Sequence, residues 1–306
     1  SGVGKKRDEI KFAIDKNILL INAESLNEIK EIEKIAKLKK KRIKVGIRLN
    51  PDTDAKTLSS ISTGKKENKF GVNNYQLKNI LASYRNSKFL DFACLSVHIG
   101  SQITSHKPYE KMLKVIQKNI DATKHYFEFI DLGGGMGIKY DSKDKILNYV
   151  KYKNLIKKFL KKNNSKIIFE PGRSIIGDTG VLLSKIIYIK KMNKIYFVIM
   201  DAGMNDLIRP ALYGARHNII PTKKNNIKIQ KKHEFVGPIC ETTDKFLTKK
   251  NFQKIEENDN LIISDVGAYG IVLSSNYNLR PIPPEILVKG SKSQTIRKRQ
   301  KYKDII

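Results

Sequence analysis

The chain has 306 residues, a hydrophobic fraction of 40% and a formal net charge of +30. This length allows one large domain or two ordinary ones. No apolar run approaches the roughly 20 residues that span a bilayer, and the start of the chain does not resemble a signal peptide. We therefore expect no membrane partner. With only Cys94 and Cys240, a disulfide framework is not expected and the reducing cytoplasm is favoured.

The positive charge could indicate nucleic-acid binding, but its composition argues against this. Of the 60 basic residues, 10 are arginine, and the lysines are spread along the whole chain beside many Ile and Asn. Specific nucleic-acid sites favour arginine and stacked aromatic side chains. We expect no specific nucleic-acid partner, only weak and salt-sensitive binding to polyanions.

Apolar, β-prone runs alternate with helical patterns up to residue 174. The expected strands are 18–25, 43–51, 92–101, 127–135 and 166–174, and the expected helices are 24–41, 75–85, 108–124 and 144–162. The segment 24–41, for example, places Leu26, Ile29 and Ile32 at helical spacing. Such alternation predicts a parallel sheet with crossover helices, so we assign residues 1–174 to an α/β domain.

The pattern changes after residue 174. Strand-like runs follow without long helices between them, at 179–191, 194–203, 233–240 and 260–270. This indicates a mostly β C-terminal domain over residues 175–306. The lysine-rich stretch 222–233 is expected to be a solvated loop or an edge strand.

Polar residues and glycines gather where the expected parallel strands end. In α/β barrels, the carboxyl ends of the strands carry the chemistry. The ends contain Asn22 and Glu24; Arg48 and Asn50; His98, Gly100 and Ser101; Asp131, Gly133, Gly134 and Gly135; and Glu170, Pro171, Gly172, Arg173 and Ser174.

Three of these ends suit a phosphate group. Consecutive glycines let backbone N–H groups approach an anion closely, and Ser101 and Arg173 offer a hydroxyl and a guanidinium. The same glycines are equally compatible with a tight turn that binds no ligand. His98 and Glu170 suit a pyridine ring, since an imidazole can stack on it and a carboxylate can keep its nitrogen protonated. His98 alone is also compatible with a structural role at a strand end.

Six motifs together resemble the diaminopimelate decarboxylases, which are fold-type III decarboxylases dependent on pyridoxal 5'-phosphate (PLP). They are SVHIGSQI (96–103), DLGGGMGI (131–138), FEPGRSI (169–175), RPALYGARH (209–217), GPICETTD (237–244) and DVGAYG (265–270). The stretches 50–72 and 276–288 (NYNLRPIPPEILV) also fit. The motifs follow the family order and cover essentially the whole chain.

The resemblance implies a PLP-binding, TIM-like β/α barrel followed by a β domain, with no metal. His98 would stack on the cofactor ring and Glu170 would pair with its nitrogen. The residues implied to hold the cofactor are His98, Ser101, Gly133, Gly134, Gly135, Glu170, Pro171, Gly172, Arg173 and Tyr269.

The resemblance also implies the reaction, the conversion of meso-2,6-diaminopimelate to L-lysine, the last step of lysine biosynthesis. Arg173, Arg209, Tyr213, Glu241 and Tyr269 would bind the substrate. Cys240 would return a proton after CO₂ leaves, together with His98 and Glu170 as catalytic residues. In such enzymes the segment with Cys240 and Glu241 reaches the partner's active site, which implies a homodimer.

Several alternatives stay open. Cys240 without its neighbours would be interpreted as a small buried hydrophobe, as we interpret Cys94. A sister decarboxylase would act on another basic amino acid or a carboxylated polyamine. A catalytically silent homologue would bind or regulate a partner. Arg209 favours a substrate with a distal carboxylate and hence the first interpretation.

One family feature has no counterpart. The family's PLP-binding lysine lies on the first barrel strand, in a motif like YAVKAN, and no such motif occurs here. We expect about six barrel strands, including a partial one at the chain start, where eight close a barrel. The sequence therefore predicts an N-terminally truncated barrel that is inactive, or severely impaired, by itself.

Overall fold

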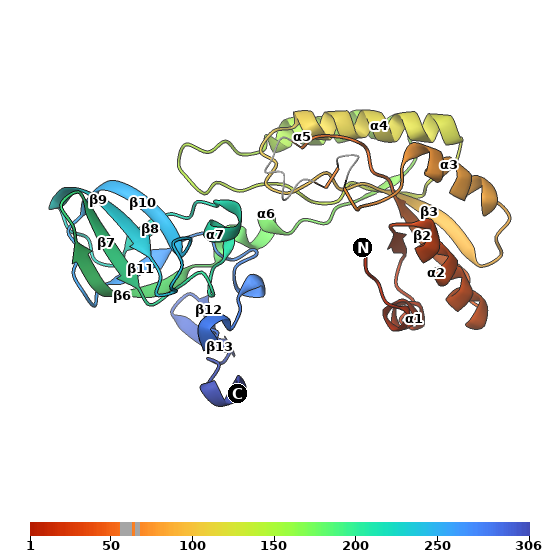
Figure 1. The fold of residues 1–306 in the computed structure, drawn as a ribbon. Helices are drawn as coiled ribbons and strands as arrows, with labels where there is room; N and C mark the ends of the chain where they lie inside the picture. The colour runs from red at the N-terminus through yellow and green to blue at the C-terminus, as the bar shows by residue number, and fades with distance from the viewer. Residues whose placement is uncertain (56–62, 65–67) are drawn as a thin grey trace. The chain divides into compact units, whose positions relative to one another are not determined.

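A computed structural model describes residues 1–55, 63–64 and 68–306, so parts of the 50–72 motif lie outside the described residues. The chain forms two compact units, one of residues 1–138 and 145–174, the other of residues 139–144 and 175–306. Figure 1 labels their elements. Within the described ranges, no helix is both long and apolar enough to cross a membrane.

The first unit is a parallel sheet with helices between its strands. The strands lie in chain order, β1 to β5, with every neighbouring pair parallel. They are β1 (Ile21–Ala23), β2 (Ile43–Arg48), β3 (Leu90–Ser96), β4 (Phe129–Asp131) and β5 (Lys166–Ile168). The helices are α1 (Arg7–Asp15), α2 (Leu26–Leu38), α3 (Asn74–Ser83), α4 (Lys107–Thr123), α5 (Tyr149–Leu160) and the short α6 (Arg173–Ile176).

Local signals explain where these helices begin. The Ser25 side chain caps α2 by accepting the Glu28 N–H, and Asn73 caps α3 in the same way. Pro108 lies in the first turn of α4, where its missing N–H costs nothing. The apolar faces of the helices pack on one face of the sheet and form the main core of the unit. Successive helices contact each other, α1 with α2, α3 with α4 and α4 with α5 (Figure 1).

The predicted barrel-like parallel sheet and its four helices are confirmed. The strands are shorter than predicted, because the glycines and polar residues at their carboxyl ends form loops instead of continuing the ladder. Residues 1–6 form no strand, so the expectation of a sixth, partial strand there is wrong. The described residues contain five strands in this sheet, and α1 is a helix that the sequence pattern did not predict.

The second unit is mostly β, as predicted. Its sheet has six strands in the order β10-β9-β7-β6-β11-β8, with β7 and β9 parallel and the other pairs antiparallel. A hairpin, β12 (Glu285–Lys289) with β13 (Lys292–Arg297), lies close to the C-terminus (Figure 1). The other elements are β6 (Leu182–Lys191), β7 (Ile195–Met200), β8 (Ile219–Pro221), β9 (Lys228–Val236), β10 (Lys245–Gln253), β11 (Asn260–Ile263) and α7 (Arg209–Tyr213), with 3₁₀ turns at Gly177–Thr179, Ile271–Leu273, Tyr277–Leu279 and Tyr302–Asp304.

The expectation for residues 222–233 is wrong for their second half. Residues 228–233 belong to β9, which lies between β10 and β7 and is therefore an interior strand. An interior strand tolerates this many lysines because alternate side chains point to opposite faces of a sheet. His233 is buried, whereas Lys232 pairs with the Glu234 carboxylate, which also binds Lys245 from β10.

Candidate active site

The register of the parallel sheet gathers polar side chains on the face opposite the helices. Because side chains alternate, Val45, Leu95 and Ile130 point into the helix-covered core. The residues between them face the other way, and the register aligns Asn22 with Gly46, and Ser96 with Asp131. The strand ends therefore present one polar surface.

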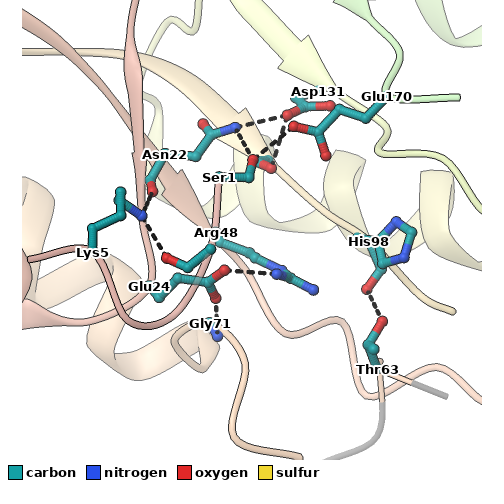
Figure 2. Close-up of polar contacts among 12 residues, drawn as sticks. Ser1, Lys5, Asn22, Glu24, Arg48, Thr63, Gly71, His98, Asp131 and Glu170 are labelled. Atoms are coloured by element: carbon teal, nitrogen blue, oxygen red, sulfur yellow. Dashed lines mark hydrogen bonds and ion pairs between the residues drawn. The ribbon is translucent and has the colours of Figure 1, made fainter. Parts of the chain in front are cut away.

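Asp131 is the centre of this polar surface. It is buried, and its carboxylate accepts hydrogen bonds from Asn22 Nδ2 at 2.8 Å, Ser96 Oγ at 3.1 Å and the Gly133 N–H at 2.9 Å. Burial raises the pKa of Asp131, and the nearby Glu170 charge adds to the rise. Ser1 links Glu170 to Asn22 (Figure 2), because its hydroxyl donates to Glu170 at 2.6 Å and accepts from the Asn22 amide, which also donates to Asp131.

A second buried group joins the ends of β1 and β2. Arg48 donates to Glu24 at 2.6 Å, and the other oxygen of Glu24 accepts the Gly71 N–H at 2.9 Å (Figure 2). The guanidinium lies over the Phe70 ring, 4.7 Å from its centroid. Both charged side chains are buried, so each charge is compensated by the other, and the Gly71 N–H also stabilises the Glu24 carboxylate.

His98 follows β3 and presents a neutral imidazole. Its Nδ1 accepts the Gly134 N–H at 3.1 Å, so the neutral ring carries its proton on Nε2. Burial lowers the pKa of His98 to about 4, and the positive charge of Arg48 contributes to this shift. A neutral imidazole that is held through one ring nitrogen in this way is suited to stacking its face on another flat ring.

The three consecutive glycines bring the ends of β3, β4 and β5 together. A Cβ at Gly133 would lie 2.6 Å from His98 Nδ1, one at Gly134 2.2 Å from the Glu170 carbonyl oxygen, and one at Gly135 2.3 Å from the Gly100 carbonyl oxygen. Gly133 and Gly135 also have positive φ angles. These contacts account for the glycines without a ligand, and a phosphate nest at the same turn stays a prediction.

The end of β5 contributes an acid and a cation. Glu170 is exposed, and the same turn continues through Pro171 and Gly172 into Arg173 at the start of α6. The Arg173 guanidinium is buried and donates to Ser101 Oγ at 3.2 Å. The structure thus brings together His98, Ser101, the three glycines, Glu170 and Arg173 at one edge of the first unit.

In the second unit, Arg209 is held in a fixed orientation. Its Nη1 donates to Nε2 of His217 at 2.8 Å, while Nδ1 of His217 donates to the Ser264 carbonyl oxygen, also at 2.8 Å. Tyr140 covers the guanidinium face, with its ring centroid 4.9 Å from Cζ. Arg209 and His217 are both buried. Tyr213 lies on the same helix, α7, at its carboxyl end.

Cys240 and Glu241 lie in the loop between β9 and β10. Both are exposed, so interpreting Cys240 as a buried hydrophobe is wrong, whereas the expectation of a buried Cys94 is confirmed. Cys240 Sγ accepts from Asn278 Nδ2 at 3.7 Å, and the Glu241 carboxylate accepts from the hydroxyls of Tyr277 and Thr243. Tyr269 is 43% exposed and has a positive φ of 58°.

Some of these partners could be recognised in the sequence and others could not. Asn22, Glu24 and Arg48 were visible as polar strand ends, but their contacts depend on the register between strands. His217, Tyr277 and Asn278 lie inside the quoted motifs without a predicted role. No sequence motif indicated a role for Tyr140, because it is the fold that brings this side chain to Arg209.

Comparison with known proteins identifies the family. The pyridoxal binding domain of the pyridoxal-dependent decarboxylases matches residues 1–177. A curated relative, diaminopimelate decarboxylase of Aquifex aeolicus, is 38% identical over 309 residues, covering 100% of this chain and 73% of its own length. The chain belongs to the diaminopimelate decarboxylase family.

Solved structures agree with this assignment. The crystal structure of diaminopimelate decarboxylase from Helicobacter pylori complexed with L-lysine is 39% identical, with a TM-score of 0.91 over 99% of this chain and 76% of that one. The diaminopimelate decarboxylase from M. jannaschii is 33% identical, with a TM-score of 0.90 over 100% of this chain and 72% of that one. The first unit therefore has the fold of a pyridoxal-binding β/α domain.

The family's cofactor is PLP, and the first unit has a donor set that fits it. A flat neutral imidazole, an exposed carboxylate and a buried guanidinium next to a hydroxyl lie at one sheet edge. These groups suit a pyridine ring, its nitrogen and a phosphate, respectively. His98, Glu170, and Arg173 with Ser101 would hold the three parts of the cofactor.

Proposed function

We propose that this protein decarboxylates meso-2,6-diaminopimelate to L-lysine in the cytoplasm. The observation that carries the proposal is the clamped Arg209, a buried cation fixed by His217 and Tyr140 within a chain related to diaminopimelate decarboxylases over its whole length. A fixed guanidinium is suited to a carboxylate. The substrate differs from other basic amino acids in carrying a carboxylate at its far end.

The roles of the residues follow from their chemistry. When bound, PLP supplies an electron sink for the carbon that loses CO₂. His98 would hold the ring face, Glu170 would keep the ring nitrogen protonated, and Arg173 with Ser101 would bind the phosphate. Arg209 with Tyr213 would bind the distal carboxylate and Glu241 the distal ammonium, and Tyr269 would contribute to binding the cofactor and the substrate. Cys240 then donates its thiol proton to the substrate carbon.

We further propose a homodimer in which Cys240 and Glu241 complete the partner's active site. Two observations support this. Both side chains are exposed, and several large apolar side chains near Tyr277 and Tyr269 in the sequence are exposed too: Val272, Leu273 and Leu279. Exposed large apolar side chains close to functional polar groups are typical of an interface.

The test is an assay of the natural protein purified from its source with added PLP. We expect CO₂ and L-lysine to form from meso-diaminopimelate, and no CO₂ from lysine, ornithine or arginine. Arg209→Met should lower kcat/KM by about a hundredfold, whereas Arg216→Met, an exposed arginine in the same motif, should not change it. CO₂ release from another basic amino acid alone would favour the sister decarboxylase, and no release from any substrate would favour a silent homologue.

A further inference from the structure

In the second unit, the loop that carries Cys240 and Glu241 contacts the segment that carries Tyr277 and Asn278. Two consecutive residues of the loop thus bind two consecutive residues of the segment. Asn278 Nδ2 donates to Cys240 Sγ at 3.7 Å, and the Tyr277 hydroxyl donates to the Glu241 carboxylate. The bond to Glu241 raises the pKa of Tyr277, since it stabilises the protonated phenol.

The Cys240 loop is fixed at its base. Buried Asp244 accepts the N–H groups of Ile239 and Met204, both at 2.7 Å. A Cβ at Gly237 would lie 2.3 Å from the same carboxylate, so the turn is tightly closed. The thiol therefore projects from a loop with little freedom to move.

The opposite segment is fixed as well. Asn276 Nδ2 donates to the carbonyl oxygen of Arg280 at 2.9 Å and to Gln300 Oε1 at 2.6 Å, which closes the turn around Asn278. Asn278 itself has a φ of 55°, a left-handed conformation that asparagine and glycine tolerate best. This backbone conformation directs the amide of Asn278 at the sulfur.

We propose that Tyr277 and Asn278 are positioning residues, which hold Glu241 and Cys240 in the geometry needed for substrate binding and proton return. The inference rests on the proposed function. When the S–H bond breaks and the proton forms a C–H bond on the substrate, negative charge stays on the sulfur until solvent reprotonates it. An N–H donor next to the sulfur stabilises that thiolate.

The thiol itself provides a test that needs no activity. The rate of Cys240 alkylation by iodoacetamide is measured against pH in the wild-type protein and in Asn278→Gly, which keeps the left-handed backbone and removes the amide. Cys94 is buried, and burial raises its pKa, so it does not compete. The titratable groups next to the thiol include Glu241 and Tyr277, which are present in both the wild-type protein and Asn278→Gly. Asn258→Gly is the matched control, because Asn258 is also exposed and left-handed, with a φ of 72°.

We expect Asn278→Gly to shift the midpoint of the alkylation profile upward by about half a pH unit, and so to slow alkylation about threefold below the midpoint. If the substitution only made the thiol more accessible to iodoacetamide, the alkylation rate at high pH would rise and the midpoint of the profile would not move. Asn278→Asp should shift the midpoint further, because a carboxylate repels the thiolate. Superimposable profiles for the wild type and both Asn278 variants would overturn the inference even if the protein decarboxylates diaminopimelate. A shifted profile without decarboxylation would refute the proposed function and leave the Asn278 contact standing.

Discussion

At the scale of single residues, the glycines after β4 show how backbone proximity restricts the sequence. Each of Gly133, Gly134 and Gly135 faces a different group of a neighbouring strand end, so that a Cβ at any of them meets an atom that cannot easily move. Gly134 is the clearest case, because its obstacle is a backbone carbonyl and its own φ is not positive. The effect of a side chain there is thus a packing effect, free of dihedral strain.

Gly134→Ala should destabilise the protein by at least about 2 kcal/mol, since the added methyl must separate β4 from the Glu170 turn. Urea unfolding at equilibrium measures this. Gly4→Ala is the matched control, because nothing lies within 4 Å of a Cβ at that position and its φ is ordinary, so it should unfold like the wild type. An unchanged midpoint for Gly134→Ala would contradict the close approach of the two strand ends.

His98 makes the stability depend on pH. Because its pKa in the folded protein is lowered to about 4, the unfolded chain binds more protons than the folded one below the ordinary value near 6.5. The stabilisation is complete above about pH 6.5 and is lost as the pH falls through about 4. We expect the wild type to lose about 3 kcal/mol over this range beyond the loss in His98→Gln. Urea unfolding between pH 4 and pH 7 measures the difference, and parallel curves for the two proteins would refute it.

At the scale of elements, α7 is only five residues long, yet it carries a buried arginine. So short a helix has little stability of its own. Its Arg209 is fixed instead by His217, which follows the helix, and by Tyr140 from the segment 139–144. His217 can serve as acceptor only because its other nitrogen donates to the Ser264 carbonyl.

His217→Leu should therefore raise the KM for diaminopimelate by about tenfold with a smaller change in kcat, because the Arg209 guanidinium loses the acceptor that orients it and keeps only the contact with Tyr140. His217→Gln, which still offers an acceptor oxygen, should restore part of the affinity. Steady-state kinetics on both variants supply the comparison. If His217→Leu lowered kcat with KM unchanged, His217 would not act through substrate binding.

The elements also show what could be predicted from sequence. The parallel strands and helices α2 to α5 were predictable, because apolar runs and helical spacing repeat in strict alternation. The contacts at the strand ends were not, since the Asp131 side chain at the end of β4 accepts hydrogen bonds from Asn22 and Ser96, which lie on other strands. The lysine-rich first half of β9 and the whole of β10 were missed because their pairing with each other, and not apolar alternation, makes them strands. The site residues were found through motifs, but the contacts of Tyr140, His217 and Asn278 depend on the fold.

At the scale of the whole molecule, the two units carry different parts of the proposed chemistry. Of the residues suited to PLP, all but Tyr269 lie in the first unit, and those suited to the distal end of the substrate and to proton return lie in the second. A homodimer with shared sites assigns Cys240 and Glu241 of one subunit to the cofactor of the other. Closed twofold dimers are the commonest assemblies, and each has two equivalent sites.

Mixing two inactive variants of the natural protein tests this arrangement. Glu170→Ala disables the first unit and Cys240→Ala the second. If sites are shared, a mixed dimer holds one site with both defects and one with none, so unfolding and refolding an equal mixture should restore about one quarter of the wild-type activity. A mixture of Glu170→Ala and His98→Ala, both in the first unit, should restore none. Absence of recovery in the first mixture, with mixed dimers present by mass, would place Cys240 in the active site of its own subunit.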